Sequence, residues 1–375
     1  MYKILFILGT RPEAIKLCPI LLHLRSRAPE FDVKVCATAQ HRAMLDQVLH
    51  VFEVTPDHDL NLMRPAQTLS QSTSRMMAAL EPVMKEEAPD MVLVQGDTTT
   101  TLCGALAAFY GRVPVGHVEA GLRTWDPWQP FPEEMNRVLT ARMADLHFAS
   151  TRGAARNLES EGVARQNIHI TGNSGIDAVL HVKRGLENGT LQGAHWPQLD
   201  PAKKLIVITA HRRESFGDGF ENICDALANL ARRDDVQIVY PVHRNPNVLD
   251  PVNRTLANLG NVFLAPPLDY VPFIDLMRRA YMLISDSGGV QEEAPSLGKP
   301  ILVLREKTER PEAVEAATAR LVGTKSAKIV SEASLLLDDP EEYARRARVH
   351  NPYGDGHASA RIGDAIHSFF EARQR

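Results

Sequence analysis

The chain has 375 residues, of which 44% are hydrophobic and 23% are charged. This composition is that of a globular protein and excludes disordered, collagen-like and coiled-coil chains. At roughly 150 residues for each domain, the length predicts two to three domains. The 42 basic and 46 acidic residues give a formal net charge of −4. Nucleic-acid-binding proteins concentrate cations along the phosphate backbone, so this charge balance argues against that class.

The hydrophobic segments are too short to cross a membrane. The first of them, residues 4–8, is also too short for the core of a signal peptide and predicts a buried strand. A disulfide framework or a zinc cluster needs closely spaced cysteines. The four cysteines instead lie far apart in hydrophobic patterns, at Cys18, Cys36, Cys103 and Cys224. We therefore expect a protein of the reducing cytoplasm that binds no membrane.

Short hydrophobic segments rich in β-branched residues alternate with longer helical patterns along the chain. Such strands, separated by helices, are typical of parallel sheets that are buried on both faces. The first series of strands is predicted over residues 3–8, 33–38, 91–95, 113–118, 146–149 and 168–171. The second series is predicted over residues 205–209, 236–240, 261–265, 282–285 and 300–304. The methionines of a helix over residues 69–84 are expected to pack in a core.

Eleven strands are too many for one domain, and residues 187–203 are polar, rich in Gly and Pro, and without a pattern. We place a boundary near Gly172, where a connecting helix over residues 174–185 leads into this linker. The sequence thus predicts an α/β protein with two doubly wound domains facing a central cleft. A last helix over residues 358–373 is predicted by a stripe of hydrophobic residues with helical spacing: Ile362, Ala365, Ile366, Phe369 and Phe370.

Polar residues follow almost every predicted strand, and they are mainly acids, histidines and arginines. Ligands of parallel sheets bind beyond the carboxyl ends of the strands, so we place the active site there. Ser287, Gly288 and Gly289 follow one strand and open a helix, whose first N–H groups can bind a diphosphate. Glu293 could accept hydrogen bonds from ribose hydroxyls. The alternative is an ordinary strand–helix turn.

Arg11, Arg212 and Arg213 would add positive charge for a nucleoside diphosphate, although surface salt bridges explain single arginines equally well. The chain has neither a G-x-G-x-x-G segment nor a Walker A sequence, so we expect no nicotinamide and no ATP.

Three acids, Asp97, Glu119 and Glu133, are predicted to lie in loops of the N-terminal half, two of them directly after buried strands. Proton transfer at carbon needs a base on one face and, for inversion, an acid on the other. Carboxylates that lie close together would hold different protonation states, because like charges resist joint ionisation. Asp97 has an alternative role as the N-cap of the next helix. Glu133 or Glu134 has an alternative role in the first turn of a helix, where a negative charge interacts favourably with the helix dipole.

His211 could protonate or neutralise a departing phosphate. His117 and His243 have similar positions, which leaves a metal site as an alternative, but no H-x-x-x-H or comparable spacing supports it. No G-x-S-x-G segment supports a serine hydrolase.

Eleven segments of the chain resemble the non-hydrolysing UDP-N-acetylglucosamine 2-epimerases. They run in the same order from one end of the chain to the other, and they begin at Gly9 (GTRPEAIK), Ala39 (AQHRAMLDQV), Gly96 (GDTTTT), Gly116 (GHVEAGLRT), Pro130 (PFPEEMNR), Thr171 (TGNSGIDA), Ala210 (AHRRESFG), Tyr240 (YPVHRNPNV), Ser285 (SDSGGVQEEAPSLGKP), Thr308 (TERPEAV) and Asn351 (NPYGDG). A collinear match of this extent is specific.

The resemblance implies two Rossmann-like domains of the glycosyltransferase-B type and a homodimer that uses no cofactor or metal in its chemistry. The first domain would span residues 1–171 with the helix 358–375 returning to it, and residues 172–357 would form the UDP-binding domain. The reaction would interconvert UDP-N-acetylglucosamine and UDP-N-acetylmannosamine through an enzyme-held 2-acetamidoglucal and UDP.

By motif match the resemblance implies a role for each candidate residue. Asp97, Glu119 and Glu133 would carry the acid–base work, and His211 would assist the departure of UDP. The residues that would hold the UDP-sugar are Arg11, Lys16, Arg212, Ser287, Gly288, Gly289 and Glu293. Some members have a second, regulatory site, to which Gln40 and His243 would belong. Ala43 stands where such members have a glutamine, so the resemblance does not imply that the substrate activates this protein.

Four alternatives remain open. A hydrolysing relative would release free N-acetylmannosamine and UDP. A glycosyltransferase would need an acceptor site, and three carboxylates near C2 would serve it poorly. A catalytically silent UDP-sugar sensor would not need the acids and His211. An epimerase of a further modified UDP-sugar, such as a diacetamido uronic acid, would share all of these residues.

Overall fold

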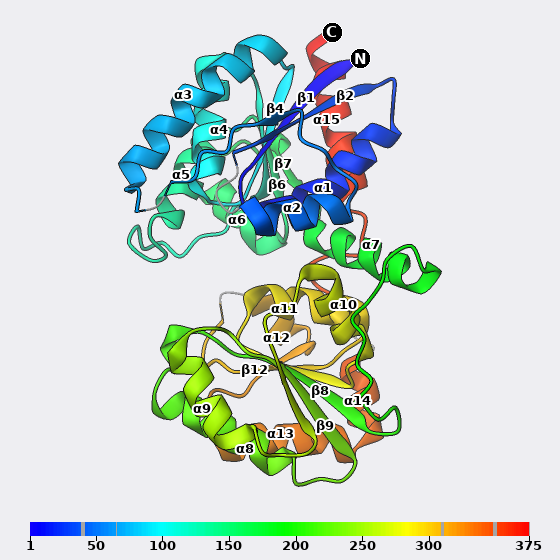
Figure 1. Cartoon of the computed structure of the whole chain (residues 1–375). Helices are drawn as coiled ribbons and strands as arrows, with labels where there is room; N and C mark the ends of the chain where they lie inside the picture. Colours follow the sequence, from blue (N-terminus) through cyan, green and yellow to red (C-terminus); the bar gives the residue numbers. More distant parts are fainter. Residues whose placement is uncertain (39–41, 65, 309–310, 348–350, 375) are drawn as a thin grey trace. The chain divides into compact units, whose positions relative to one another are not determined.

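The computed structural model describes residues 1–38, 42–64, 66–308, 311–347 and 351–374. The chain forms two compact units. The first unit comprises Met1–Ala178 and Gly354–Arg375, and the second comprises Val179–Tyr353. Each unit is built around one parallel sheet, which confirms the predicted α/β class (Figure 1).

The sheet of the first unit has seven strands in the order β3-β2-β1-β4-β5-β6-β7, all parallel. The chain first adds strands on one side of β1 and then crosses to the other side with β4. Ligands of such sheets bind at the point where the direction of winding reverses, beyond the ends of β1 and β4. The strands are β1 (Tyr2–Leu8), β2 (Phe31–Ala37), β3 (His58–Asp59), β4 (Met91–Gln95), β5 (Val115–Ala120), β6 (Leu146–Ala149) and β7 (Ile168–Ile170).

The sheet of the second unit has six parallel strands in the order β10-β9-β8-β11-β12-β13. Its winding reverses between β8 and β11, so a second ligand position is expected beyond the ends of these two strands. The strands are β8 (Lys204–Thr209), β9 (Val236–Pro241), β10 (Val262–Ala265), β11 (Met282–Ser285), β12 (Ile301–Val303) and β13 (Ala319–Leu321).

Helices cover both faces of each sheet (Figure 1). Those that begin in the first unit are α1 (Arg11–Ser26), α2 (Arg42–Val51), α3 (Leu69–Glu87), α4 (Thr99–Tyr110), α5 (Glu133–Met143), α6 (Arg152–Ser160), α7 (Ser174–Asn188) and α15 (Ala358–Gln374). Those of the second unit are α8 (Asp218–Leu230), α9 (Pro246–Leu256), α10 (Tyr270–Arg279), α11 (Gly288–Glu293), α12 (Pro311–Glu315), α13 (Ser326–Asp338) and α14 (Pro340–Ala347). Short 3-10 turns occupy Arg165–Asn167, Arg213–Ser215 and Ala294–Leu297.

All eleven predicted strands are present, as are the predicted connecting and C-terminal helices. Two short edge strands, β3 and β13, were not predicted. Each has two or three residues and carries charge (Asp59 in β3, Arg320 in β13), so neither has the hydrophobic run that marks a buried strand.

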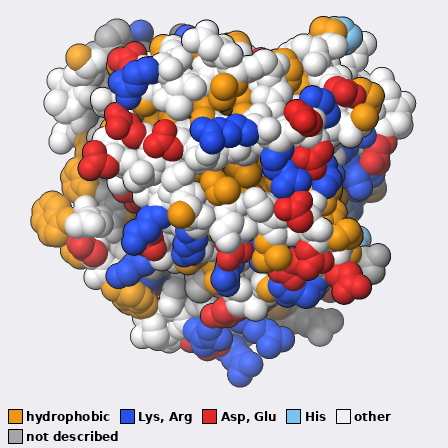
Figure 2. Space-filling view, turned by 90° about the horizontal axis from the view of Figure 1, so that it is seen from below, with side chains coloured by type: hydrophobic (Ala, Val, Ile, Leu, Met, Phe, Trp, Pro, Cys, Tyr) orange, Lys and Arg blue, Asp and Glu red, His pale blue; other side chains and the backbone are white. Residues whose placement is uncertain are grey.

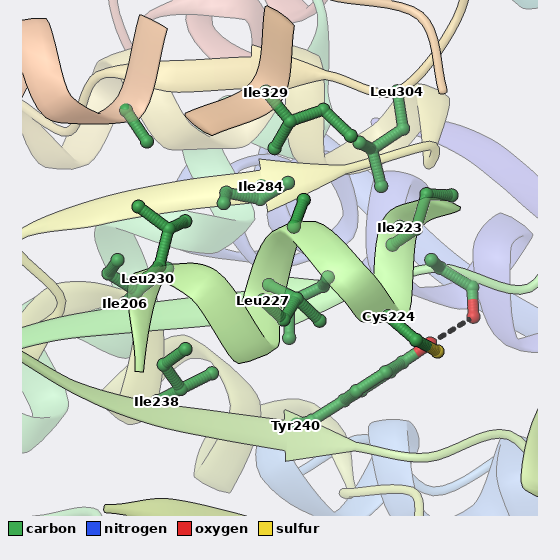
Figure 3. Packing of buried hydrophobic residues seen from close by; sticks show 14 of the residues in the cluster. Ile206, Ile223, Cys224, Leu227, Leu230, Ile238, Tyr240, Ile284, Leu304 and Ile329 are labelled. Carbon is green, nitrogen blue, oxygen red and sulfur yellow. Dashed lines mark hydrogen bonds between the residues drawn. The ribbon is translucent and has the colours of Figure 1, made fainter. Parts of the chain in front are cut away.

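Each unit has its own hydrophobic core. In the second unit α8, α9 and α13 pack on the sheet through side chains such as Leu227 and Ile284 (Figure 3). In the first unit Met76 and Met84 are buried and Met77 packs against the same cluster, which confirms the predicted core role of this helix. All four cysteines are buried in these cores, and burial raises the pKa of each thiol to about 12.

The C-terminal helix α15 completes the first unit. It packs beside α1 (Figure 1), and the Phe370 ring stacks on Tyr2 with centroids 4.1 Å apart. Its first turn is capped from α7, because the Asp177 carboxylate accepts hydrogen bonds from the backbone N–H groups of Ala358 (3.3 Å) and Ser359 (2.8 Å). Two chain segments 181 residues apart are therefore joined where the chain leaves the first unit and returns to it.

Basic and acidic side chains are interspersed over the face shown in Figure 2. This mixture is what a nearly balanced set of 42 basic and 46 acidic residues would produce. Within the described ranges every helix is too short or too polar to span a bilayer.

Candidate active site

A cavity of about 160 Å³ lies where the winding of the first sheet reverses. It is enclosed by the first turns of α1, the loop after β4, the end of β5 and one residue of α5. Three of the candidate residues, Lys16, Asp97 and Glu119, line it together. The full lining is Thr10, Pro12, Glu13, Lys16, Gln95, Gly96, Asp97, Thr98, Glu119, Leu122 and Arg137.

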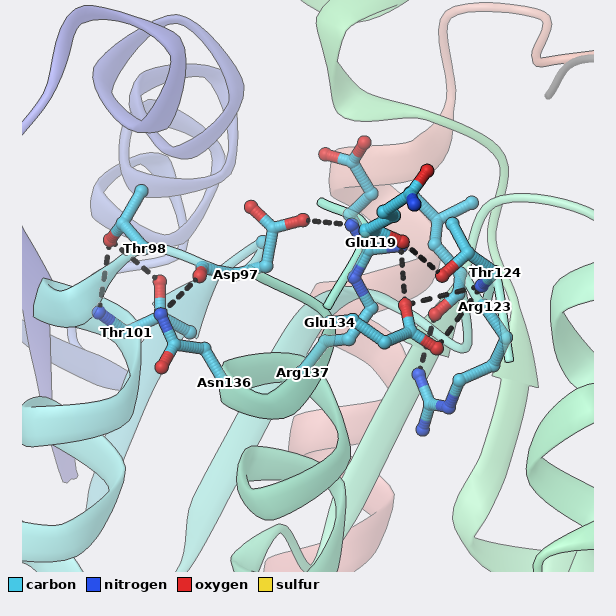
Figure 4. Close-up of polar contacts among 12 residues, drawn as sticks. Asp97, Thr98, Thr101, Glu119, Arg123, Thr124, Glu134, Asn136 and Arg137 are labelled. Carbon is cyan, nitrogen blue, oxygen red and sulfur yellow. Dashed lines mark hydrogen bonds and ion pairs between the residues drawn. The ribbon is translucent and has the colours of Figure 1, made fainter. Parts of the chain in front are cut away.

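Asp97 is held in the loop after β4 by two residues of α5 (Figure 4). Its Oδ2 atom accepts a hydrogen bond from Arg137 Nη2 at 2.7 Å, and its carbonyl accepts one from Asn136 Nδ2 at 2.8 Å. Burial raises the pKa of Asp97, the Arg137 guanidinium opposes this, and the neighbouring Glu119 carboxylate adds to it. The alternative N-cap role is wrong, because the N-cap of α4 is Thr98.

Glu119 lies within β5, so its predicted place in a loop is wrong. The pairing of β5 with β6 slips by one residue between Val118 and Ala120, which leaves Glu119 as a bulge. Its φ of +61° is in the left-handed region, which a residue with a Cβ seldom adopts. Such a strained backbone is common where a site must aim a side chain. The Glu119 carboxylate points to Lys16 Nζ and Gln95 Nε2 and contacts both.

Two cations come from α1. Lys16 lies in its second turn and forms the ion pair with Glu119, 103 residues later. Arg11 is the first residue of the helix and is half-buried. Pro12 in the first turn and the capping residue Thr10 fix where the helix begins, so they also fix where these two side chains start.

Glu133 and Glu134 open α5 and have different surroundings. Glu133 is half-buried as the first residue of the helix, and its negative charge adds to the raised pKa of Asp97. The buried Glu134 accepts hydrogen bonds from the backbone N–H groups of Thr124 (3.1 Å, Figure 4) and Trp125 (3.0 Å). Glu134 therefore holds the loop after β5 in place rather than serving only the helix dipole.

His117 is completely buried in β5, and its Nε2 atom lies 2.7 Å from the Gly96 carbonyl oxygen. Burial lowers its pKa to about 3, so the ring is a neutral donor that holds the loop before Asp97. Among the described residues, no group of three or more His, Cys, Asp or Glu side chains is placed to hold a metal ion.

The other candidate residues surround the reversal point of the second sheet. His211 and Arg212 follow β8, and their backbone N–H groups both donate to Asp286 Oδ2 at 2.7 Å. The His211 ring stacks on that of His243, with centroids 5.5 Å apart. The hydroxyl of Tyr240, a core residue (Figure 3), donates to the Ala210 carbonyl at 2.8 Å and so fixes the backbone directly before His211.

The predicted diphosphate cradle lies at the start of α11, with Ser287 as N-cap. Ser287 N–H donates to Ser285 Oγ (3.0 Å), which keeps the Ser287 backbone against the end of β11. Gly289 is exposed, and a Cβ there would meet only Ser287 Oγ and Glu293 Oε1, each at 4.0 Å. The cradle is therefore open above the first N–H groups of the helix, as an anion site requires.

The structure thus groups Lys16, Asp97 and Glu119 around one cavity of the first unit, whereas Glu133, at the start of α5, is not among the residues that line it. In the second unit His211 and Arg212 contact Asp286, which directly precedes the cradle of Ser287, Gly288 and Gly289, and His243 stacks on His211. Gln40 lies outside the described residues.

Gln95, Arg137 and Asp286 contact the candidate residues but were not predicted from the sequence to have a role. Gln95 carried a usable signal as a polar end to a hydrophobic strand, whereas Arg137 meets Asp97 across 40 residues of sequence, a contact that no local pattern indicates.

Comparison with known proteins identifies the family of this fold and site. The sequence model of the UDP-N-acetylglucosamine 2-epimerase family matches residues 24–367. The chain belongs to this family. It is 56% identical to a UDP-N-acetylglucosamine 2-epimerase of Escherichia coli O157:H7, over 97% of this chain and 98% of that protein. The chain is accordingly an enzyme, an isomerase.

Solved structures agree over the whole chain. The UDP-GlcNAc 2-epimerase of Neisseria meningitidis, bound to UDP-GlcNAc, has a TM-score of 0.88 and 46% identity, covering 98% of this chain and 100% of that one. The enzyme of Methanocaldococcus jannaschii, in complex with UDP-GlcNAc and UDP, has a TM-score of 0.75 and 31% identity, covering 98% of this chain and 99% of that one. The predicted two-domain glycosyltransferase-B type fold is thereby confirmed.

Proposed function

We propose that the protein interconverts UDP-N-acetylglucosamine and UDP-N-acetylmannosamine by eliminating and re-adding UDP, without hydrolysis. The observation that carries this proposal is the pair of carboxylates in one cavity, Asp97 beside a guanidinium and Glu119 beside an ammonium group. An epimerisation at carbon needs a base on one face and an acid on the other, and different partners allow two carboxyls to hold different protonation states.

The C2 proton of the sugar is not acidic by itself, so the bond from C1 to the diphosphate must weaken as the proton leaves. One carboxylate takes the C2 proton, the electrons of that C–H bond form the C1=C2 bond, and the C1–O electrons leave with UDP. The charge that develops on the diphosphate would be stabilised by the N–H groups at Ser287, Gly288 and Gly289, by Arg11 and Arg212, and by His211. Glu293 would bind the ribose.

In the second half UDP attacks C1 of the 2-acetamidoglucal, and the C1=C2 electrons take a proton from a carboxylic acid on the opposite face. Asp97, Glu119 and Glu133 supply the base and the acid, and Lys16 holds Glu119 in place. One carboxyl ends each turnover protonated and the other deprotonated, so both return to their starting states by proton exchange with water. No step transfers a hydride, so the route requires no nicotinamide.

The test is proton NMR of UDP-N-acetylglucosamine with the protein in D₂O, without NAD and with a chelator. The proposal predicts UDP-N-acetylmannosamine with deuterium at C2. Free N-acetylmannosamine and UDP would show a hydrolysing enzyme. An unchanged substrate would refute both and point to a modified UDP-sugar, which the same assay can then test.

We also propose that the protein is a cytoplasmic homodimer. In support, α4 and α5 pack side by side and leave four large hydrophobic side chains exposed, Phe109, Tyr110, Met135 and Leu139. Exposed hydrophobic groups of this size favour contact with another protein surface. Light scattering during size-exclusion chromatography distinguishes a dimer from a 41.5 kDa monomer.

A further inference from the structure

Glu13 is a buried carboxylate of the first unit that the proposed chemistry does not use. It is the third residue of α1 and is 1% exposed. Its Oε2 atom accepts hydrogen bonds from the backbone N–H groups of Gly9 (3.0 Å) and Thr10 (2.6 Å). Its Oε1 atom accepts hydrogen bonds from the hydroxyls of Thr98 (2.7 Å) and Thr101 (3.3 Å). The carboxylate therefore joins the start of α1 to the loop after β4, 85 residues away.

The two segments that Glu13 joins hold the two carboxylates of the cavity: one contains Asp97, and the other contains Lys16, the ion-pair partner of Glu119. Thr98 follows Asp97 directly, so the Thr98 hydroxyl fixes the backbone on which Asp97 stands. Lys16 lies one turn beyond Glu13 on α1, where it forms the ion pair with Glu119. A displacement of α1 relative to this loop would change the spacing between Asp97 and Glu119.

Capping the helix alone does not explain a buried charge at this position. The N-terminus of α3 has the same kind of capping box, in which Thr68 accepts from Gln71 N–H and Gln71 Oε1 accepts from Thr68 N–H. There the neutral, exposed Gln71 side chain is sufficient. At α1 the carboxyl is buried, and burial raises the pKa of Glu13 against the hydrogen bonds that favour its ionised form. The contacts that separate Glu13 from Gln71 are the hydrogen bonds from the Gly9 N–H group and from the hydroxyls of Thr98 and Thr101, of which the Thr98 bond is the shortest (2.7 Å).

We propose that Glu13 is a positioning residue, which sets the distance between Asp97 and the Lys16–Glu119 pair through its hydrogen bond to Thr98. This inference rests on the proposed epimerase function. Misplacing reacting groups by about 1 Å can reduce a rate by about 100-fold, so loss of the bond should appear in kcat.

The test compares two caps that are matched in kind. Thr98→Val removes the hydroxyl that Glu13 accepts from and also the N-cap of α4, whereas Thr68→Val removes only the N-cap of α3. Thr98→Ser keeps the hydroxyl, and Glu13→Gln keeps the shape of the side chain without the charge. Each variant is assayed for epimerisation with kcat calculated per UDP-binding site, where the number of sites is measured by calorimetry with UDP.

We expect Thr98→Val and Glu13→Gln to lower kcat by about 10- to 100-fold with little change in KM, and the double variant to lose no more than the worse single variant. Thr98→Ser should keep far more activity than Thr98→Val, and Thr68→Val should lose less than about threefold. Equal losses in Thr98→Val and Thr68→Val, or full kcat in Thr98→Val and Glu13→Gln, would overturn the inference. A wild-type protein that does not epimerise would refute the proposed function instead.

Discussion

The Asp97 carboxylate lies 2.7 Å from Arg137 Nη2, and this ion pair joins the loop after β4 to helix α5. Arg137 is also 3.3 Å from the buried carboxylate of Glu134. A single guanidinium thus stabilises both a carboxylate of the cavity and the one that holds the loop after β5.

Arg137→Gln should move the acidic limb of the pH profile to higher pH. Burial raises the pKa of Asp97 and the Arg137 guanidinium opposes this, so its loss raises the pKa of Asp97 further. If Asp97 must be ionised to accept the C2 proton, kcat/KM will begin to fall at a higher pH than in the wild type. The control is Arg142→Gln on the exposed side of the same helix, where the profile should stay in place. An unmoved profile in Arg137→Gln would separate Asp97 from the limiting ionisation.

Asp97→Asn, Glu119→Gln and Glu133→Gln should each lower turnover by about 100-fold or more, because each removes a proton carrier. UDP should still bind to all three, since the proposed diphosphate cradle belongs to the second unit. Activity is measured by NMR and UDP binding by calorimetry. The exposed Glu159→Gln of α6 is the matched control and should be fully active. Full activity in all three variants would disprove the assigned roles.

The sheets and the position of the candidate site were predictable because they depend on local patterns. A buried parallel strand is a hydrophobic run, and Asp97 attracts notice as an acid two residues after such a run. The partners of these residues depend on tertiary contacts. Arg137 and Asn136 lie on the buried side of α5, where a helical pattern predicts hydrophobic residues.

The backbone of Glu119 was not predictable from the sequence either. A positive φ is signalled by Gly, Asn or Asp, and a glutamate carries no such signal. The bulge appears only when the register between β5 and β6 is known, which is why Glu119 was expected in a loop.

Acid should destabilise the protein through its buried histidines, and His117→Gln should reduce the effect. His117 protonates near pH 6.5 in the unfolded chain but only at about pH 3 in the fold, because burial lowers its pKa. The unfolded state therefore binds the proton first, and the free energy of unfolding falls as the pH drops below about 6.5. Between pH 7 and pH 5 the loss due to His117 is about 2 kcal/mol.

Denaturant titrations at these two pH values measure this difference, and the exposed His50→Gln is the control. The wild type and His50→Gln should lose about 2 kcal/mol more than His117→Gln. Equal acid losses in all three proteins would show that His117 is protonated in the fold.

Gly289→Ala should weaken UDP binding without weakening the fold. The added methyl group meets nothing in the protein closer than 4.0 Å, and the position is in a helix, where alanine is favoured over glycine by roughly 0.5–1 kcal/mol. The methyl group would, however, occupy space above the N–H groups that we assign to the diphosphate. We expect the UDP affinity to fall by about tenfold or more, which is about 1.4 kcal/mol.

The control for this substitution is Gly260→Ala, at an exposed position with no atom within 4 Å. It should leave UDP binding unchanged. A Gly289→Ala protein that binds UDP as tightly as the wild type would place the diphosphate elsewhere.

The packing of α15 against α1 has a consequence for the order in which the protein is assembled during synthesis. Residues 179–353 form a continuous unit and can fold as soon as they leave the ribosome. The first unit is made of two separate segments. The contacts of α1, Tyr2 and the Asp177 carboxylate with residues 358–374 can therefore form only after those last residues are synthesised. The half of the enzyme that is translated first is therefore the half that is completed last.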